Sequence, residues 1–460
     1  ETAIRAFKVL GCFDCARIDM RLDADGNLYI LEVNSLPSLG EHGSYVEGAL
    51  RAGLDFPALV NRLVDVAASR YFGTPNPPVL NGGKVSPDEK IFSYITQRRD
   101  DVERQIRQWT MRHSRTSDPV GLQSAHEELD SQLVDLGLKS VAALSDKRVA
   151  WTWQTPAGLK DGTLLIAHLD VPMDNNAAVP AFRRDPEWLY GEGIGASRAP
   201  LVSMQFALRA LKHARRLRKL PLGVLVYADE GSDCRYSSDL IAETAGQAQN
   251  VLVLRPGNLG DQVVTGRRGQ RRYQLTVEGK PQRLGKSTTQ TEALRWLYEK
   301  LEACSKLGTR KERTAVSAIE IKSTHLPMLL PHRVAVTLLV SYPDEAIGDR
   351  IEAAIRALLK DRRIRTGLEL ISSRPPMKDR RANQRLLKQL GNVAERWEIP
   401  LTRESSVWPS VAGLASGSTR VACGVGPIAR DLYTPDEAVQ RTSLIQRTLL
   451  LAQFLNQQID

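Results

Sequence analysis

Apolar positions follow two different spacings along the chain, and their alternation predicts an α/β protein. Short apolar runs at 164–167 and 222–227 have the length and residue types of buried strands. Between them, at 202–216, apolar residues recur at helical spacing. Strands separated by helices are typical of a mostly parallel sheet that helices cover. Further helices are predicted at 86–113, 124–136, 383–397 and 443–455.

A region with a different pattern interrupts this core at about 271–371. Strand patterns at 272–278, 317–322 and 334–340 occur there with helix patterns at 291–304 and 347–359. We expect a compact α+β insert between two segments of one main domain, 87–270 and 372–460. A Pro- and Gly-rich linker is predicted at 73–86, after a separate unit at 1–72.

Residues 14–34 of the first unit predict a β-hairpin. Two stretches of alternating residues flank the segment 23–27, which reads Asp-Ala-Asp-Gly-Asn. Gly26 stands at a position that suits a positive φ, as tight hairpin turns require. A helix pattern at 56–70 follows the hairpin.

Polar residues of this hairpin are predicted to converge on one face. Residues two apart on a strand point the same way, so Arg17 and Asp19 share a face, as do Glu32 and Asn34. The hairpin brings the two faces together. Carboxylate and amide oxygens suit Mg²⁺ that also holds phosphates. An Arg beside them would stabilise charge on a transferring phosphoryl group.

A His and an Asp follow the buried strand at 164–167. His168 and Asp170 are two positions apart, so they emerge side by side at the strand end. A metal-binding His usually donates its second ring N–H to a carboxylate, and this pair fits that arrangement. The same residues also fit a core His beside a turn Asp, and the tripeptide alone leaves both interpretations open.

Composition narrows the classes of function. The chain has 460 residues, of which 42% are apolar, enough for several domains with sizeable cores. The net charge is +10, but no nucleic-acid motif accompanies it, so solvated basic helix faces are expected. The sequence contains no run of 18 or more apolar residues, so no membrane span is predicted. Five scattered cysteines and no visible signal peptide predict a cytoplasmic protein.

Residues 1–72 resemble the C-terminal part of the ATP-grasp ligases, most closely D-alanine–D-alanine ligase. The similar segments are Ala-Arg-Ile-Asp at 16–19 and Leu-Glu-Val-Asn-Ser-Leu-Pro at 31–37. The resemblance implies ATP as a substrate and Mg²⁺ held by Asp19, Glu32 and Asn34. It also implies that Arg17 stabilises an acyl-phosphate step. Such a ligase needs further regions upstream of the hairpin, so we expect the chain to be a fragment of a longer fusion.

Residues 87–460 resemble the di-zinc metallopeptidases and deacylases that include acetylornithine deacetylase, succinyl-diaminopimelate desuccinylase and glutamate carboxypeptidase. The landmarks fall in the family's order: His-x-Asp at 168–170, Leu-Tyr-Gly-x-Gly at 189–193, Asp-Glu at 229–230 and Thr-Pro-Asp-Glu at 434–437. The resemblance implies an α/β metallopeptidase fold with the insert as its lid. It also implies an amino acid or peptide as ligand and a homodimer formed through the lid.

The zinc ligands of that family are largely replaced here. A site of this kind needs two metals about 3.5–4 Å apart, a bridging carboxylate and a Glu as general base. The resemblance assigns the base to Glu230, one zinc ligand to His168 and the orienting carboxylate to Asp170. A catalytic zinc takes three protein ligands, so we expect a pocket that has lost its metals. The other ligand positions fall on Ala196, Gly231, Arg255 and Tyr433.

Three functions are compatible with these features. The leading hypothesis is an ATP-dependent carboxylate–amine (dipeptide-type) ligase, fused to a metallopeptidase-fold domain that binds or scaffolds without cleaving. The second is an active metallohydrolase with a rearranged zinc site, in which acids such as Asp174, Asp233 or Asp261 serve as ligands.

The third hypothesis is a module without enzymatic activity. Arg255 takes a ligand position, and Arg283 takes the place of a lid His. Together with Arg267, these side chains would form a pocket for an anion or a peptide. A phosphate or sulfate bound at the former metal site would favour this hypothesis.

Overall fold

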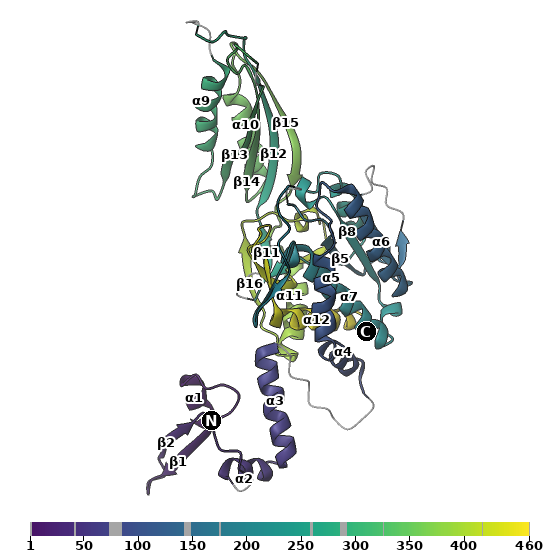
Figure 1. The fold of residues 1–460 in the computed structure, drawn as a ribbon, viewed down its shortest axis with the longest axis vertical. Coiled ribbons are helices and arrows are strands. Elements are labelled where there is room, and N and C mark those ends of the chain that lie inside the picture. The colour runs from purple at the N-terminus through teal and green to yellow at the C-terminus, as the bar shows by residue number, and fades with distance from the viewer. Residues whose placement is uncertain are drawn as a thin grey trace. The chain divides into compact units, whose positions relative to one another are not determined.

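The computed structural model describes residues 2–40, 43–72, 85–141, 149–173, 176–257, 261–285, 292–324, 326–415 and 417–459. The chain divides into two units, Glu1–Asn76 and Pro77–Asp460 (Figure 1). Most of the linker predicted at 73–86 lies outside the described residues, and so does Asp174.

The small unit contains the predicted hairpin. Its elements are α1 (Thr2–Val9), β1 (Arg17–Leu22), β2 (Leu28–Asn34), α2 (Ser44–Arg51) and α3 (Phe56–Phe72). The Asp23 carboxylate accepts hydrogen bonds from the backbone N–H groups of Asp25 and Asn27, at 3.0 and 2.8 Å. Gly26 has a φ of +84°, which glycine adopts without strain. The turn therefore forms at the predicted place.

A mixed sheet forms the centre of the large unit. Among the described residues its strand order is β16-β11-β17-β9-β5-β8-β4-β3. In that order the strands span Thr402–Ser406, Gln262–Arg267, Arg420–Cys423, Asn250–Val253, Thr163–His168, Leu222–Tyr227, Ala150–Gln154 and Lys139–Val141. The four strands from β17 to β8 run parallel, as predicted, whereas β3 and β4 pair antiparallel at one edge. An apolar run predicts a strand but carries no information about its direction.

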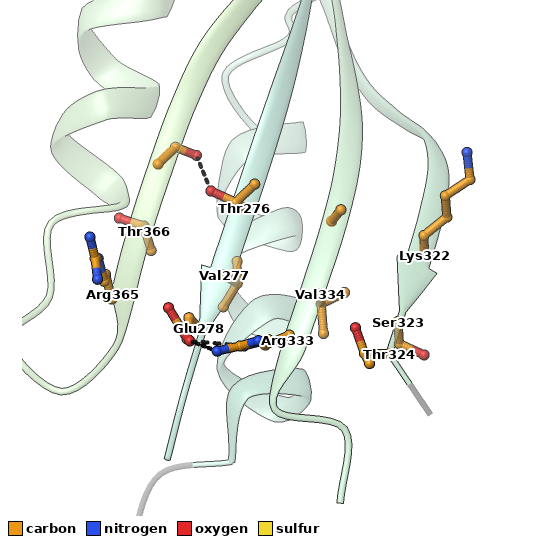
Figure 2. Close-up of a pocket in the computed structure, with 12 residues that line it drawn as sticks. Thr276, Val277, Glu278, Lys322, Ser323, Thr324, Arg333, Val334, Arg365 and Thr366 are labelled. Carbon is orange, nitrogen blue, oxygen red and sulfur yellow. Dashed lines mark hydrogen bonds and ion pairs between the residues drawn. The ribbon is translucent and has the colours of Figure 1, made fainter. Parts of the chain in front are cut away.

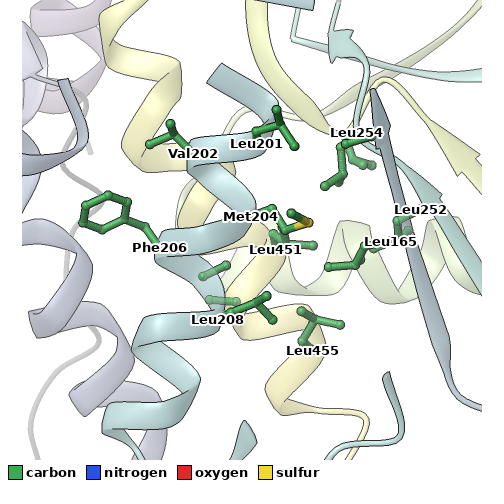
Figure 3. Close-up of a cluster of buried hydrophobic side chains, with 14 of the residues drawn as sticks. Leu165, Leu201, Val202, Met204, Phe206, Leu208, Leu252, Leu254, Leu451 and Leu455 are labelled. Atoms are coloured by element: carbon green, nitrogen blue, oxygen red, sulfur yellow. The ribbon is translucent and has the colours of Figure 1, made fainter. Parts of the chain in front are cut away.

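Two helices pack their apolar sides against this sheet. They are α7 (Ala199–His213) and α12 (Arg441–Asn456). Figure 3 shows Leu201 and Leu208 of α7 beside Leu451 of α12, with Leu165 of β5 and Leu252 of β9 opposite. All five side chains are buried. Such burial removes apolar surface from water and stabilises the fold by about 25 cal/mol per Å², so this cluster holds the two helices on the sheet.

The remaining helices correct two sequence predictions. They are α4 (Pro87–Thr96), α5 (Arg99–Thr110), α6 (Pro119–Asp135), α8 (Ser238–Gly246) and α11 (Arg381–Arg396). The helix predicted at 86–113 is two helices, because the chain turns at 97–98. The helix predicted from residue 124 begins at Pro119, since the Asp118 side chain caps it by accepting the Gly121 N–H. None of the described helices combines the length and apolar character that crossing a membrane requires.

A smaller sheet positions one wall of the site. Its order is β10-β18-β19-β7-β6. The strands span Pro256–Gly257, Gly426–Arg430, Ala438–Gln440, Trp188–Tyr190 and Arg183–Arg184. The loop from β18 to β19 and the π-helical turn Ile194–Arg198 after β7 are joined through Glu437.

The insert forms a four-stranded antiparallel sheet with two helices on one face (Figure 1). The strands are β12 (Gly269–Glu278), β13 (Ala315–Ser323), β14 (Arg333–Tyr342) and β15 (Arg365–Arg374), and the helices are α9 (Ala293–Ser305) and α10 (Glu345–Leu358). The boundaries expected at 271 and 371 fall inside β12 and β15. Strand β15 was not predicted, because its Gly, Glu and Arg residues obscure the apolar alternation.

Candidate functional site

Three parallel strands of the central sheet end at the same edge. Strand β5 ends at His168, β8 is followed by Glu230 in the turn Glu230–Ser232, and β9 is followed by Arg255. In open α/β sheets this edge is the usual place for a ligand. The structure therefore brings together three residues that the sequence singled out.

The His168 and Asp170 side chains form the predicted pair. The Nδ1 atom of His168 donates to the backbone oxygen of Asp170 at 2.9 Å and lies 3.3 Å from its carboxylate. The other carboxylate oxygen accepts from Thr116 Oγ1 at 2.6 Å and from the Gly231 N–H at 3.1 Å. Within the described structure, His168 Nε2 is buried and has no hydrogen-bond partner. That nitrogen is therefore available to a ligand.

Glu230 lies at the centre of a buried cluster of charges. Its Oε1 accepts hydrogen bonds from Arg255 and Arg374, both at 3.0 Å, and its Oε2 accepts from the Tyr227 hydroxyl at 2.8 Å. Arg374 also donates to the Glu230 backbone oxygen at 3.0 Å. Arg255 uses its other nitrogen to reach the Tyr433 hydroxyl at 2.8 Å. The side chains of Glu230, Arg255, Arg374 and Tyr227 are buried, and that of Tyr433 is partly buried.

The electrostatics of this cluster oppose a role for Glu230 as a general base. Burial alone would raise the pKa of Glu230, but the charges of Arg374 and Arg255 outweigh burial and hold the pKa well below its usual range. A general base works best when its pKa lies near the operating pH. The carboxylate is instead a fixed anion that compensates two guanidinium groups.

The residues present do not fit a di-zinc centre. At Gly231, a Cβ atom would lie 2.3 Å from Thr116 Oγ1, so an acidic side chain has no room there. Arg255 and Tyr433, which the resemblance places at two more ligand positions, bind each other and Glu230. No group of three or more His, Cys, Asp or Glu side chains that could hold a metal ion occurs in the described ranges.

The Glu437 carboxylate, to which the sequence analysis gave no role, holds the backbone at Ala196 in place. Glu437 Oε1 accepts the backbone N–H groups of Gly195 and Ala196, both at 2.7 Å, and Oε2 accepts that of Tyr433 at 2.9 Å. Burial raises the pKa of Glu437. Glu437 thus anchors two of the replaced positions to each other by backbone contacts.

The other candidates of the sequence have separate places. Arg267 donates to Cys423 Sγ at 3.2 Å and to the Trp408 backbone oxygen at 3.2 Å. Arg255 reaches the adjacent Pro409 oxygen at 3.4 Å, so these two Arg side chains flank one loop. Arg283 is exposed in the lid, where its backbone is bridged to Leu329.

The two acids proposed as substitute ligands have cationic neighbours. Asp233 forms an ion pair with Arg272 and lies 3.6 Å from Arg374. Asp261 lies 4.0 Å from Arg447. The sequence analysis did not single out Arg374, which lies where the chain returns from the lid to the main domain. The Arg-Pro-Pro sequence at 374–376 gives little indication of this contact, because 144 residues separate Arg374 from Glu230.

The hairpin of the small unit brings its four candidate residues together. The register places Asp19 opposite Glu32 and Arg17 opposite Asn34. Arg17 donates two hydrogen bonds to Asp19, at 3.0 and 2.9 Å, and one to Glu32 at 2.9 Å. Asn34 accepts the backbone N–H of Leu36. The two carboxylates and the amide are the oxygen ligands that Mg²⁺ prefers, so this set fits the metal.

Comparison with known proteins identifies the small unit. Residues 1–65 match the family model described as D-ala D-ala ligase C-terminus. The D-alanine–D-alanine ligase of Pelotomaculum thermopropionicum is 42% identical over 67 residues, which are 15% of this chain and 21% of the ligase. The chain spans about a fifth of the length of the curated relatives it matches.

Comparison of structures identifies the fold of the rest. Human carnosine dipeptidase 1 superposes with a TM-score of 0.62 at 13% identity, over 81% of this chain and 99% of the dipeptidase. A di-peptidase from Saccharomyces cerevisiae also gives 0.62, at 15% identity, over 81% of this chain and 98% of its own. The large unit has the dipeptidase fold. The fold implied by the resemblance to metallopeptidases is thereby confirmed.

Proposed function

We propose that the chain is part of an ATP-dependent carboxylate–amine ligase joined to a dipeptidase-fold unit that binds a short peptide without zinc-dependent cleavage. One observation carries the second half of this proposal. Glu230, the expected base, is neutralised by Arg255 and Arg374 where the metal centre would stand. A guanidinium fixed at this place repels a divalent cation and attracts a carboxylate.

The ligase half rests on the hairpin and on the family match of residues 1–65. In a complete ligase, Asp19, Glu32 and Asn34 would hold Mg²⁺, which neutralises phosphate charge when bound. Arg17 would then exchange its contacts with Asp19 and Glu32 for the transferring phosphoryl group. ATP is the expected phosphoryl donor. The rest of the ATP site is expected from parts of such ligases that this chain does not match.

The ligand class of the large unit is inferred from both kinds of relative. The names of these relatives concern the joining of two D-alanines in one case and dipeptides in the other. A molecule with two free termini is the chemistry common to them. We further propose that the chain acts in the cytoplasm, since all five cysteines are free, and that the lid supports a homodimer.

Dialysis of the chain against a mixed pool of dipeptides tests this proposal. After incubation with Zn²⁺ and desalting, the chain is expected to retain members of the pool and to release no free amino acids. Mass spectrometry of both compartments measures retention and cleavage together.

The control for the dialysis is the same chain with Glu230→Gln, which removes the residue that the resemblance assigns as the base. Release of amino acids by the unsubstituted chain, abolished in this variant, would contradict the proposal. That result would establish a zinc hydrolase. Retention without cleavage by the unsubstituted chain supports the proposal.

A further inference from the structure

One face of the lid sheet is left open by the helices. The side chains of Tyr273 and Leu275 on β12 pack with α9 and α10, so Gln274 and Thr276 between them point to the other face. Gln274 lies opposite Thr337 on β14 and Glu369 on β15, and Thr337 lies opposite Glu320 on β13. A row of polar side chains therefore crosses all four strands on the open face.

Small residues make this face concave. In the row beyond Gln274, Thr276 has Ala335 on one side and Gly367 on the other. Longer side chains surround these small residues. One hollow of about 630 Å³ lies at the end of the sheet far from the body, beside the ion pair of Glu278 with Arg333 (Figure 2). A second hollow of about 670 Å³ lies where the sheet meets the body.

Two β-bulges direct apolar side chains into the second hollow. The pairing of β13 with β14 skips Ile319, and that of β15 with β12 skips Ile371. Both skipped residues line the hollow. Bulges are enriched next to active sites, where they re-aim a side chain. Two independent strands thus each use an extra residue to place an isoleucine at the same cavity.

The second hollow is also lined by charges of both signs. Arg235 lines it from the body, and Arg272, Glu320 and Glu369 line it from the lid strands β12, β13 and β15. In the part of the chain that the structure describes, Arg235 has no carboxylate partner and Glu369 has no cationic one. Arg272 pairs with Asp233 and Glu320 pairs with Lys322, so Arg235 and Glu369 are the two opposite charges of this cavity that leave room for a ligand carrying both.

We propose that this hollow binds the free amino acid or dipeptide in its zwitterionic form. Arg235, with Arg272 behind it, receives the carboxylate, and Glu369, with Glu320, receives the ammonium group. An apolar side chain of the ligand contacts Ile319 and Ile371. The volume lies within the usual range of about 300–1,000 Å³ for small-molecule sites. The inference rests on the proposed function and assigns the place where its ligand binds.

The hollow lies beside the cluster at Glu230. Asp233 forms the ion pair with Arg272 that lines the hollow, and it also contacts Arg374, which holds Glu230. A carboxylate that draws Arg272 away from Asp233 would change the charge beside Arg374. The former catalytic edge and the lid cavity are therefore electrostatically connected.

Calorimetry with a dipeptide retained in the dialysis, together with its N-acetyl and C-amide derivatives, tests the inference. Each derivative removes one charge, and its binding should weaken about tenfold or more, as expected for a lost charged hydrogen bond. Glu369→Gln should weaken binding of the free dipeptide by a similar factor. In this variant, N-acetylation of the dipeptide should cause little further loss of binding. Arg235→Gln should do the same for amidation.

Glu299→Gln and Arg295→Gln are the matched controls, because these exposed residues of α9 lie on the covered side of the sheet. Both should bind the dipeptide as the unsubstituted chain does. If Glu369→Gln and Arg235→Gln also leave binding unchanged, the hollow is not the site, although peptide binding itself stands. If the unsubstituted chain retains no dipeptide at all, the proposed function fails and the assignment with it.

Discussion

Replacing Arg374 with Met is expected to lower the free energy of unfolding of the large unit by about 3–5 kcal/mol. The substitution removes both hydrogen bonds that Arg374 makes to Glu230 and leaves a buried carboxylate with one guanidinium instead of two. Urea unfolding followed by tryptophan fluorescence measures this effect. Every Trp of the sequence lies at residue 109 or later, so the signal reports the large unit alone.

The control is Arg350→Met, which breaks an exposed ion pair with Glu312 and should cost about 0–1 kcal/mol.

The pH dependence of the free energy of unfolding provides a second check. The pKa of Glu230 is lowered in the folded chain, so its contribution is present above the pKa of an unfolded Glu, about 4.3. The contribution is lost as the pH falls through the folded value, and Glu230→Gln should remove this component. A loss below about 1 kcal/mol for Arg374→Met would contradict the account.

Introducing an acid with Gly231→Glu is expected to destabilise the large unit by about 3 kcal/mol or more without creating a metal site. The Cβ at this position would meet Thr116 Oγ1 at 2.3 Å, Thr116 Cβ at 2.9 Å and Pro172 Cβ at 3.1 Å. Thr116 cannot withdraw freely, because it donates to Asp170. The same unfolding assay, with zinc analysis of the purified variant, measures both effects.

Gly246→Glu is the matched control, since a Cβ there meets nothing within 4 Å. It should alter the free energy of unfolding by no more than about 0.5 kcal/mol, as at most exposed positions. A Gly231→Glu chain that unfolds like the control and binds zinc would show that the pocket can open to accept a ligand side chain. The account of a closed metal site would then be wrong.

The sequence was sufficient for the parts of the fold that depend on local pattern. The strand at 222–227 forms over those residues, and the hairpin turns at 23–27, because apolar length and Gly26 are local properties. The break at 97–98 and strand β15 were missed. In both cases neighbouring residues favour a continuous helix or an exposed loop, and tertiary contacts decide otherwise.

The candidate site could be predicted only in outline. His168 ends a strand, and Glu230 and Arg255 each follow one, so their common edge was foreseeable. The contact of Arg374 with Glu230 was not foreseeable, because no spacing in the sequence connects two residues on different domains. The role of Thr116 in closing the space beside Gly231 was hidden for the same reason. Packing over long sequence separations determines which replaced ligand positions are open.

The zinc content of the purified chain, after incubation with Zn²⁺ and desalting, tests the central claim most directly. Elemental analysis gives the number of zinc ions per chain. The account predicts well below one, because Arg255 and Arg374 hold the position with fixed positive charge and Gly231 has no room for a ligand. A value near two would contradict it and would identify a working di-zinc centre built from other residues.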